Sequence, residues 1–438
     1  MPPALPDSLA KLLSLLRPAF TAPSFDTFCW LVHGFIGRVG EHTVTGVWQA
    51  ARLAGVVHHS RAHDFFARRC WSADRLGLLV AEFVVRRFVD PDDPIRVAVD
   101  DTLFPRAGRK VFAASWHFDC AAPRGATRRL RFGNSFVCLG IIARLGGRVV
   151  CLPLLFRLWR PADDGDPPIT RVELAHQLIA CFAERFSGRR IEVCADAYYA
   201  NRSLRKLPAN VSACVRLRAN ASLLALPPTT RRHGPGRPRL RGEPLGSVRE
   251  LAADPDARWQ RLRVADKRLE AITIDCLWYR ILGTRPVRVV IARDPSQRNQ
   301  PPLAVLCTDT TVSAPQILAQ YLDRWAIEVA FAEAKLQLGV GETRNRVQAA
   351  VQRSVPFGFL SRALVIIWYE LHGDPRSDVA RHRANAPWYR HKHTPSFADM
   401  LVALRRELIK AEFMRARHHP PTRPKTTALP TPATATQP

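Results

Sequence analysis

Residues 321–335, YLDRWAIEVAFAEAK, carry four polar side chains at spacings that a helix brings onto one side. They are Tyr321, Arg324, Glu328 and Lys335. At about 100° per residue these positions fall within an arc of about 60°. An acid flanked by two cations and a phenol suits a phosphate ligand, because the acid can hold a metal while its neighbours hold the phosphates. The alternative is a solvated helix face with an ordinary i,i+4 ion pair between Arg324 and Glu328.

This stretch lies in a predicted long helix that begins at Ser313 and runs to Leu338. Ser313 and Gln316 form a capping box at its start, and Gly339 is a residue type that commonly ends a helix. An apolar stripe beside the polar face predicts the surface by which the helix packs on a sheet. The stripe consists of Leu318, Leu322, Trp325, Val329 and Leu336.

Two predicted strands end in acidic residues. The stretch IRVAVD alternates with period two, which predicts a strand that ends at Asp100 and Asp101. Residues 190–195 predict another strand, and Asp196 follows it. Strand ends of one sheet lie close together, so a helix packed across the sheet can bring Glu328 to these acids.

A cluster of Asp101, Asp196 and Glu328 repels itself unless a divalent cation neutralises it. Oxygen-only ligands suit Mg²⁺, for which Mn²⁺ can substitute. Two such ions about 4 Å apart can activate a water or a 3′-hydroxyl and stabilise the leaving oxygen of a phosphodiester. Taken singly, each acid is better explained as a solvated carboxylate, and Asp100 competes with Asp101 for the first position.

The sequence resembles the DDE transposases that bacterial insertion sequences encode, in the group with a Tyr-Arg-Glu-Lys signature. Residues 321–335 match the spacing of that signature, Asp-Asp-Thr at 100–102 resembles the motif of the first aspartate, and Ala-Asp-Ala-Tyr-Tyr at 195–199 resembles that of the second. In this family the acid directly before the threonine is usually the ligand, which favours Asp101. The resemblance covers about residues 91–372.

The resemblance implies an α/β fold: an RNase H-like mixed-sheet catalytic core with a mostly β insertion and flanking helical domains. It implies Mg²⁺-dependent cleavage at the ends of an element and joining of the 3′-hydroxyls to target DNA, with Asp101, Asp196 and Glu328 as catalytic and metal-binding residues. The implied partners are double-stranded DNA, as terminal inverted repeats and target, and a second copy of the chain in the synaptic complex. The alternatives are another nuclease of this fold and a DNA-binding regulator that has lost catalysis.

The pattern of apolar, polar and Gly/Pro residues changes four times along the chain, which predicts five segments. Within the first of them, residues 45–55 and 61–69 predict two short helices, which fit a helix-turn-helix or an ordinary helical bundle equally well. The segments are an N-terminal helical DNA-binding domain (1–90), the first part of the core (91–220), a β-rich insertion (221–309), the second part of the core (310–375), and a C-terminal helix with a basic disordered tail (376–438).

The net charge is the strongest signal of the composition. The chain has 65 Lys and Arg residues against 38 Asp and Glu residues, a balance of +27, which favours nucleic acid as partner over a generic basic surface. Arg237 and Arg239 lie in a Gly/Pro/Arg-rich run that resembles a minor-groove hook, although a flexible loop on phosphates is the simpler explanation. Trp159, beside Arg157 and Arg160, can stack on a base, although a core tryptophan is simpler.

Other classes of protein are disfavoured. No apolar run approaches the roughly 20 residues that span a bilayer, and the N-terminus lacks the pattern of a signal peptide. The ten cysteines form no Cys-x-x-Cys pair, so we expect buried thiols in a reducing, bacterial cytoplasm, near the nucleoid, rather than zinc ligands or disulfides. His117 can approach the acidic cluster, although a structural role is the simpler explanation.

Overall fold

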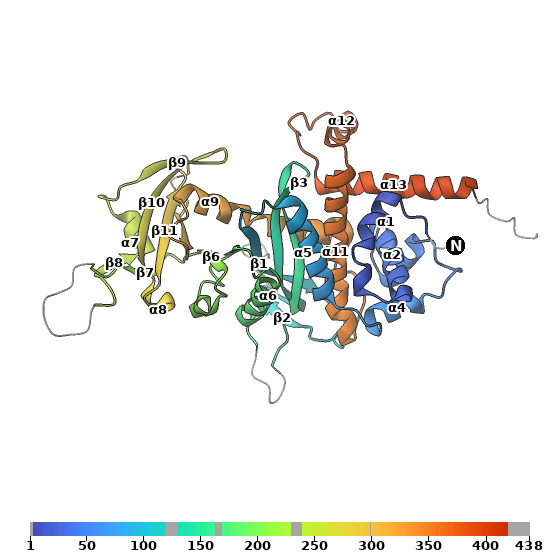
Figure 1. The fold of residues 1–438 in the computed structure, drawn as a ribbon, viewed down its shortest axis with the longest axis horizontal. Helices are drawn as coiled ribbons and strands as arrows, with labels where there is room; N and C mark the ends of the chain where they lie inside the picture. The colour runs from blue at the N-terminus through green and yellow to red at the C-terminus, as the bar shows by residue number, and fades with distance from the viewer. Residues whose placement is uncertain (1–2, 119–128, 163–168, 229–238, 298, 419–438) are drawn as a thin grey trace, which may run out of the picture.

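The computed structural model describes residues 3–118, 129–162, 169–228, 239–297 and 299–418. The molecule is elongated, with the strands of residues 222–307 at one end, the central strands of the same sheet in the middle and the N-terminal helices at the other end (Figure 1). The fold is mixed α/β, as predicted.

The strands of the described residues join into one twelve-stranded sheet. Along the sheet the order is β2-β3-β1-β5-β6-β12-β11-β10-β7-β8, while β4 pairs with β3 and β9 with β10. In chain order the strands are β1 (Ile95–Pro105), β2 (Ser115–Phe118), β3 (Leu130–Leu145), β4 (Arg148–Leu158), β5 (Ile191–Ala195), β6 (Val211–Arg216), β7 (Ser222–Leu224), β8 (Pro244–Ser247), β9 (Gln260–Val264), β10 (Lys267–Leu277), β11 (Pro286–Arg293) and β12 (Leu303–Cys307).

Helices cover this sheet and form both flanks of its central part. Those of the described residues are α1 (Asp7–Ser14), α2 (Ala22–Gly37), α3 (Val44–Ala50), α4 (Ser60–Ala67), α5 (Ala73–Phe88), α6 (Arg171–Arg185), α7 (Val248–Ala253), α8 (Tyr279–Leu282), α9 (Ala314–Asp323), α10 (Ala326–Leu338), α11 (Gln348–His372), α12 (Pro375–Asn385) and α13 (Phe397–His418).

The centre of the sheet is parallel and its neighbours are antiparallel. β5 and β6 run parallel to β1, whereas β3 is antiparallel to β1 on its other side. The β-rich residues expected as an insertion do not form a separate sheet, because β12 pairs with β6 and so continues the central sheet outward. β1 also runs on to Pro105, so the prediction that this strand ends at Asp101 was wrong.

Two local signals in the sequence predict structure that is confirmed: Gly146-Gly147 between two strand-like runs predicts a hairpin turn, and Thr170 with Glu173 predicts a capped helix start. Gly146 and Gly147 join β3 to β4 with φ of +61° and +75°, the backbone that a two-residue type I′ hairpin turn requires. Thr170 and Glu173 form the capping box at the start of α6, in which each side chain accepts a hydrogen bond from the backbone N–H of the other residue.

The long helix expected over residues 313–338 is interrupted. α9 ends at Asp323 and α10 begins at Ala326, with Arg324 and Trp325 in a turn between them. The N–H groups of Arg324 and Ile327 each donate to the carbonyl three residues earlier, so the backbone tightens here. Neither proline nor glycine marks this point, which is why the sequence gives no warning of it.

The apolar stripe predicted for this helix forms only part of its packing surface: Leu318 is buried and Leu322 packs against the core, but the stripe fails at two positions. Trp325 is 61% exposed and Leu336 is 84% exposed. Apolar side chains outside the predicted stripe are buried as well, namely Ile317, Ile327, Ala330, Phe331, Ala334 and Leu338. The interruption changes the helical phase between α9 and α10, and the polar face of the predicted site turns toward β1.

α11 is the central helix of the core. It is as long and apolar as a membrane-spanning helix, but most of its apolar stretch is buried within the protein, as in a core helix. Phe357 on α11 contacts the rings of Phe28 and Phe65, and so joins the N-terminal helices to the core. The predicted helices at 45–55 and 61–69 are α3 and α4 of that helical group.

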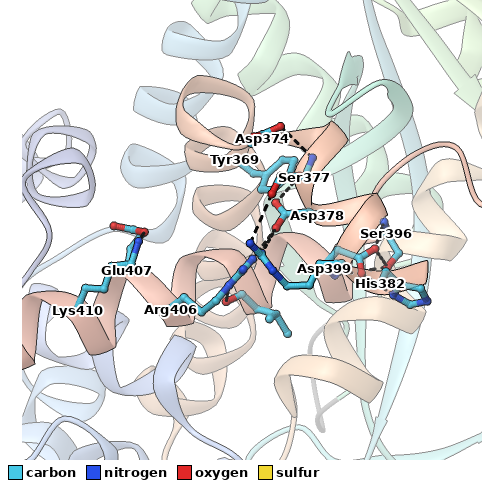
Figure 2. A network of polar contacts seen from close by, with 12 residues as sticks. Tyr369, Asp374, Ser377, Asp378, His382, Ser396, Asp399, Arg406, Glu407 and Lys410 are labelled. Carbon is cyan, nitrogen blue, oxygen red and sulfur yellow. Dashed lines mark hydrogen bonds and ion pairs between the residues drawn. The ribbon is translucent and has the colours of Figure 1, made fainter. Parts of the chain in front are cut away.

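A polar network fastens the C-terminal helices to α11 (Figure 2). Asp378 on α12 is 7% exposed, accepts a hydrogen bond from the Tyr369 hydroxyl at 2.8 Å, and lies 2.5 Å from Arg406 of α13. Asp399 near the start of α13 contacts His382 of α12 at 2.9 Å. Three helices are therefore joined by one set of hydrogen bonds and ion pairs.

Candidate active site

The two aspartates at the centre of β1 lie on opposite faces of the sheet, because successive side chains of a strand alternate. Asp100 accepts a hydrogen bond from Arg324, in the turn between α9 and α10. Asp101 accepts one from the hydroxyl of Tyr199 at 3.3 Å, and Arg171 at the start of α6 lies 3.4 Å away. Helices α9 and α10 thus approach one carboxylate, and α6 approaches the other.

Arg324 joins the acid of β1 to the acid of α10. Its Nη1 lies 3.2 Å from Oδ2 of Asp100, and its Nη2 lies 2.8 Å from Oε1 of Glu328. The side chain is 7% exposed, and its guanidinium lies 5.4 Å from the ring centre of Tyr321. Its Nε is buried and makes no hydrogen bond to any described residue. The predicted i,i+4 pair exists, but as part of a buried bridge rather than on a solvated face.

Asp196 is the third acid of this group. It follows β5, whose register on β1 pairs Val99 with Ala195, so Asp196 comes alongside Asp100. Burial raises the pKa of Asp100 to about 7, and the carboxylates of Asp101 and Asp196 add to this rise. Burial is the larger cause of this rise, and the repulsion between neighbouring carboxylates is the smaller one.

Lys335 extends the polar face along the same side of β1. Its Nζ donates to Oγ1 of Thr102 at 2.6 Å and lies 5.0 Å from the ring centre of Phe104. Thr102 and Phe104 share the face of Asp100 because they are two and four residues further along the strand. The signature residues of α9 and α10 are therefore lined up along β1.

Sequence reasoning missed Arg171, which organises the face of Asp101. Its Nε donates to Oγ of Ser135 at 3.2 Å, and its guanidinium lies over the ring of Trp159, 5.1 Å from the centre. Burial raises the pKa of Asp101, while Arg171 and the hydrogen bond from Tyr199 oppose that rise. No local pattern singles out Arg171, because the chain brings it to Asp101 only by folding.

His117 belongs to the same cluster. Its Nδ1 lies 2.9 Å from Nη2 of Arg171, and its Nε2 lies 3.0 Å from Oγ of Ser115. Since a guanidinium only donates, Nδ1 accepts and Nε2 carries the proton. Burial and the charge of Arg171 lower the pKa of His117, which keeps the ring neutral. The ring also packs edge-on against Trp159, with centroids 5.2 Å apart.

Of the other predicted DNA-binding residues, Trp159 packs on the cluster and Arg239 lies apart from it. Trp159 is half-buried between Arg171 and His117, on the Asp101 side of the sheet. Arg239 is exposed, shortly before β8, and lies 3.2 Å from Glu243. Arg237 lies outside the described residues.

Glu333, the other glutamate of α10, takes no part in the cluster. It is 8% exposed and forms ion pairs with Arg148 of β4 and Arg362 of α11. Arg362 is fully buried and also donates to the carbonyl of Cys151 at 2.8 Å. This network ties α10, α11 and β4 together, which is a structural role.

The donor chemistry of the acidic cluster fits a divalent cation. All donors are carboxylate oxygens, which Mg²⁺ and Mn²⁺ prefer as ligands. Within the described parts of the chain, no three His, Cys, Asp or Glu side chains converge closely enough to hold an ion as they stand. Arg324 and Arg171 take up the carboxylates in this arrangement.

Comparison with known families places the chain in a group of enzymes. The sequence model described as DDE superfamily endonuclease matches residues 16–280, a segment that contains Asp100, Asp101 and Asp196 but ends before Glu328. No curated protein matches the chain. Endonucleases of this superfamily act on DNA and generally use divalent metal ions. Because the match spans more than half of its length, the chain belongs to the DDE superfamily of endonucleases.

Proposed function

We propose that this protein is a DNA transposase of the insertion-sequence type, with an RNase H-like catalytic core. It binds the terminal inverted repeats of its element, cleaves at the ends and joins the 3′-hydroxyls to target DNA. The observation that carries the proposal is the bridge of Arg324 between Asp100 and Glu328, because it links an acid of the central strand to an acid of the signature helix beside Asp196.

The proposed catalytic and metal-binding residues are Asp101, Asp196 and Glu328. The motif favours Asp101 for the first position, whereas the contacts favour Asp100, which alone of the two shares Arg324 with Glu328. The proposal has these two forms, which differ only in the acid of β1. Divalent cations held there would supply an activated water or 3′-hydroxyl and stabilise the leaving oxygen of the phosphodiester.

The remaining signature residues position DNA in this proposal. Arg324 and Lys335 lie on the Asp100 side of β1 and bring two positive charges to the site. A phosphate can replace the carboxylate of Asp100 as acceptor for the Arg324 guanidinium, whose planar geometry suits it. Tyr321 lies against that guanidinium and limits its orientation. Trp159, Arg237 and Arg239 are proposed as further DNA contacts.

The test uses DNA that carries both ends of the element, taken from the genomic flanks of the gene. Wild-type protein with Mg²⁺ should cleave this DNA and, given pre-cleaved ends, join them to a target plasmid. Glu328→Gln should lose at least a hundredfold of both activities but keep binding in a gel shift, because the amide keeps the volume and weakens metal ligation. Asp266→Asn, in the exposed turn between β9 and β10, makes the same change of charge far from the site and should leave activity unchanged.

Two results would reject the proposal. Sequence-specific binding without cleavage by the wild type would leave the DNA-binding regulator as the explanation. Cleavage without joining of pre-cleaved ends would leave another nuclease of this superfamily. The proposal also expects a homodimer on paired ends, since each end needs its own site. One protomer on two ends, measured by light scattering, would reject that assembly.

A further inference from the structure

The hairpin of β2 and the first residues of β3 exposes an aromatic face to solvent. The register pairs Trp116 with Phe132 and Phe118 with Leu130, so these four side chains share one face of a two-stranded ribbon. Trp116 is 67% exposed, and Phe118 and Leu130 are each 59% exposed. Single exposed apolar residues are ordinary, but a group of this size on one ribbon marks an interaction surface.

The opposite face of this ribbon is tied to the acidic cluster. His117, between the two exposed rings, points inward and is 5% exposed. It contacts Arg171 at 2.9 Å, and Arg171 lies 3.4 Å from Asp101. The aromatic face therefore lies on the outer side of β2. On the inner side of β2, His117 contacts Arg171, which in turn contacts Asp101, a proposed catalytic acid.

The charge around the ribbon is positive. The described stretches 105–118 and 129–133 contain five Arg and Lys residues and neither Asp nor Glu. Arg109, Lys110 and Arg129 are exposed. A cationic rim around aromatic rings suits a polyanion with flat apolar faces, and nucleic acid has both properties.

We propose that the face made by Trp116, Phe118, Leu130 and Phe132 stacks on unpaired bases of the DNA end while its backbone approaches the acidic cluster. This inference rests on the proposed function and names a substrate feature of the same site. Bases within a duplex are covered by their neighbours, so the surface selects DNA whose end has opened. Stacking on aromatic side chains tolerates any base, so the preference is for open ends rather than for a sequence.

The test measures binding rather than chemistry. A Glu328→Gln background without added metal prevents cleavage, and fluorescence anisotropy compares a fully paired DNA end with one that has four unpaired terminal bases. The background protein should bind the open end about tenfold more tightly. Trp116→Ala should remove most of this preference and leave affinity for the paired end within twofold. A 2-aminopurine in the open end should be quenched by the background protein and less so by Trp116→Ala.

The matched control is Trp388→Ala. Trp388 is 72% exposed between α12 and α13, so the change removes an equally exposed indole elsewhere. Phe118→Ala provides a second variant of the ribbon, and the thermal midpoint of each variant shows that folding is retained. Equal preference for open ends in Trp116→Ala, Phe118→Ala and Trp388→Ala would overturn the inference. So would a change of oligomeric state in the ribbon variants with an unchanged preference, because the face would then contact protein.

The readouts separate this inference from the proposed function. A preference for open ends that the ribbon variants lose supports the inference even if the wild type fails to cleave with Mg²⁺. Cleavage and joining by a wild-type protein that binds both ends equally would support the function and reject the inference.

Discussion

Asp100 and Asp101 are adjacent in sequence, yet their carboxylates face different helices across the sheet. Arg324 holds Asp100 from the turn before α10, and Arg171 holds Asp101 from the start of α6. Only Asp100 shares its arginine with Glu328. β1 thus offers two candidate metal ligands. Which of them can share a metal with Glu328 depends on the face of the sheet that each occupies, and sequence spacing does not decide it.

Single amide substitutions separate the two forms of the proposed site. If the ligand is the acid that faces Glu328, Asp100→Asn should lower Mg²⁺-dependent cleavage at least a hundredfold, and Asp101→Asn should lower it less than tenfold. The reverse order would assign the role to Asp101, as the motif favours. Gel shifts should show DNA binding within a few-fold of wild type for both variants, because neither change adds negative charge.

Glu333→Gln should act on stability rather than on chemistry. The substitution leaves Arg362, which is fully buried, without its charge partner, and breaking one half of a buried ion pair costs about 3–5 kcal/mol. Urea unfolding should show this loss, while cleavage per folded molecule stays within a few-fold of wild type. The double variant Glu333→Leu with Arg362→Met should be more stable than Glu333→Gln, since it leaves no buried guanidinium unpaired. A loss of cleavage at full stability would contradict the structural role.

Acid should weaken the N-terminal helices through His33. This side chain is 4% exposed, and its nearest acidic partner is Glu412 at 3.9 Å. Burial lowers the pKa of His33 to about 4, against 6.5 for an exposed ring. Above pH 6.5 the ring is neutral in both the folded and the unfolded chain, so His33 does not reduce the free energy of unfolding. As the pH drops toward 4, the unfolded chain takes up the proton first, and the free energy of unfolding falls by up to about 3 kcal/mol.

The variant His33→Leu isolates this contribution. Neither ring nitrogen of His33 has a hydrogen-bond partner among the described residues, so an apolar side chain of similar size can replace it. The unfolding free energy of His33→Leu should fall less steeply than that of wild type between pH 6.5 and pH 4. Equal slopes in urea titrations of the two proteins would contradict the assignment.

The sequence predicted features that depend on local patterns and missed those that depend on distant contacts. The β3–β4 turn follows from two glycines, and the start of α6 from a capping box, since both signals lie within four residues. The contact of Arg171 with Asp101 joins a helix start to a strand centre, and nothing local to either residue encodes it. For the same reason the composition of α10 could not show that Ile327 and Phe331, rather than Trp325 and Leu336, are buried.

The interruption between α9 and α10 is the clearest failure of periodicity. A single helical phase places Arg324 and Glu328 on one arc, and the structure keeps them paired. In the turn, backbone N–H groups donate to the carbonyl three residues earlier. The Arg324 side chain donates to Asp100 of β1, which lies 224 residues earlier in the chain. Periodicity describes a uniform helix, so it cannot register a turn that is stabilised from outside the helix.

The last prediction concerns the charge balance of the acidic cluster. Arg324→Gln removes the cation shared by Asp100 and Glu328, so the metal-free protein should unfold at a lower temperature than wild type. Mg²⁺ should then raise the midpoint of the variant by a few degrees more than that of wild type, because it compensates carboxylates that the guanidinium no longer neutralises. Arg96→Gln is the matched control: Arg96 lies on the same face of β1 but pairs with Glu192 and Asp323. An equal Mg²⁺ shift in all three proteins, measured by calorimetry, would show that Arg324 and the cation do not compete for the same carboxylates.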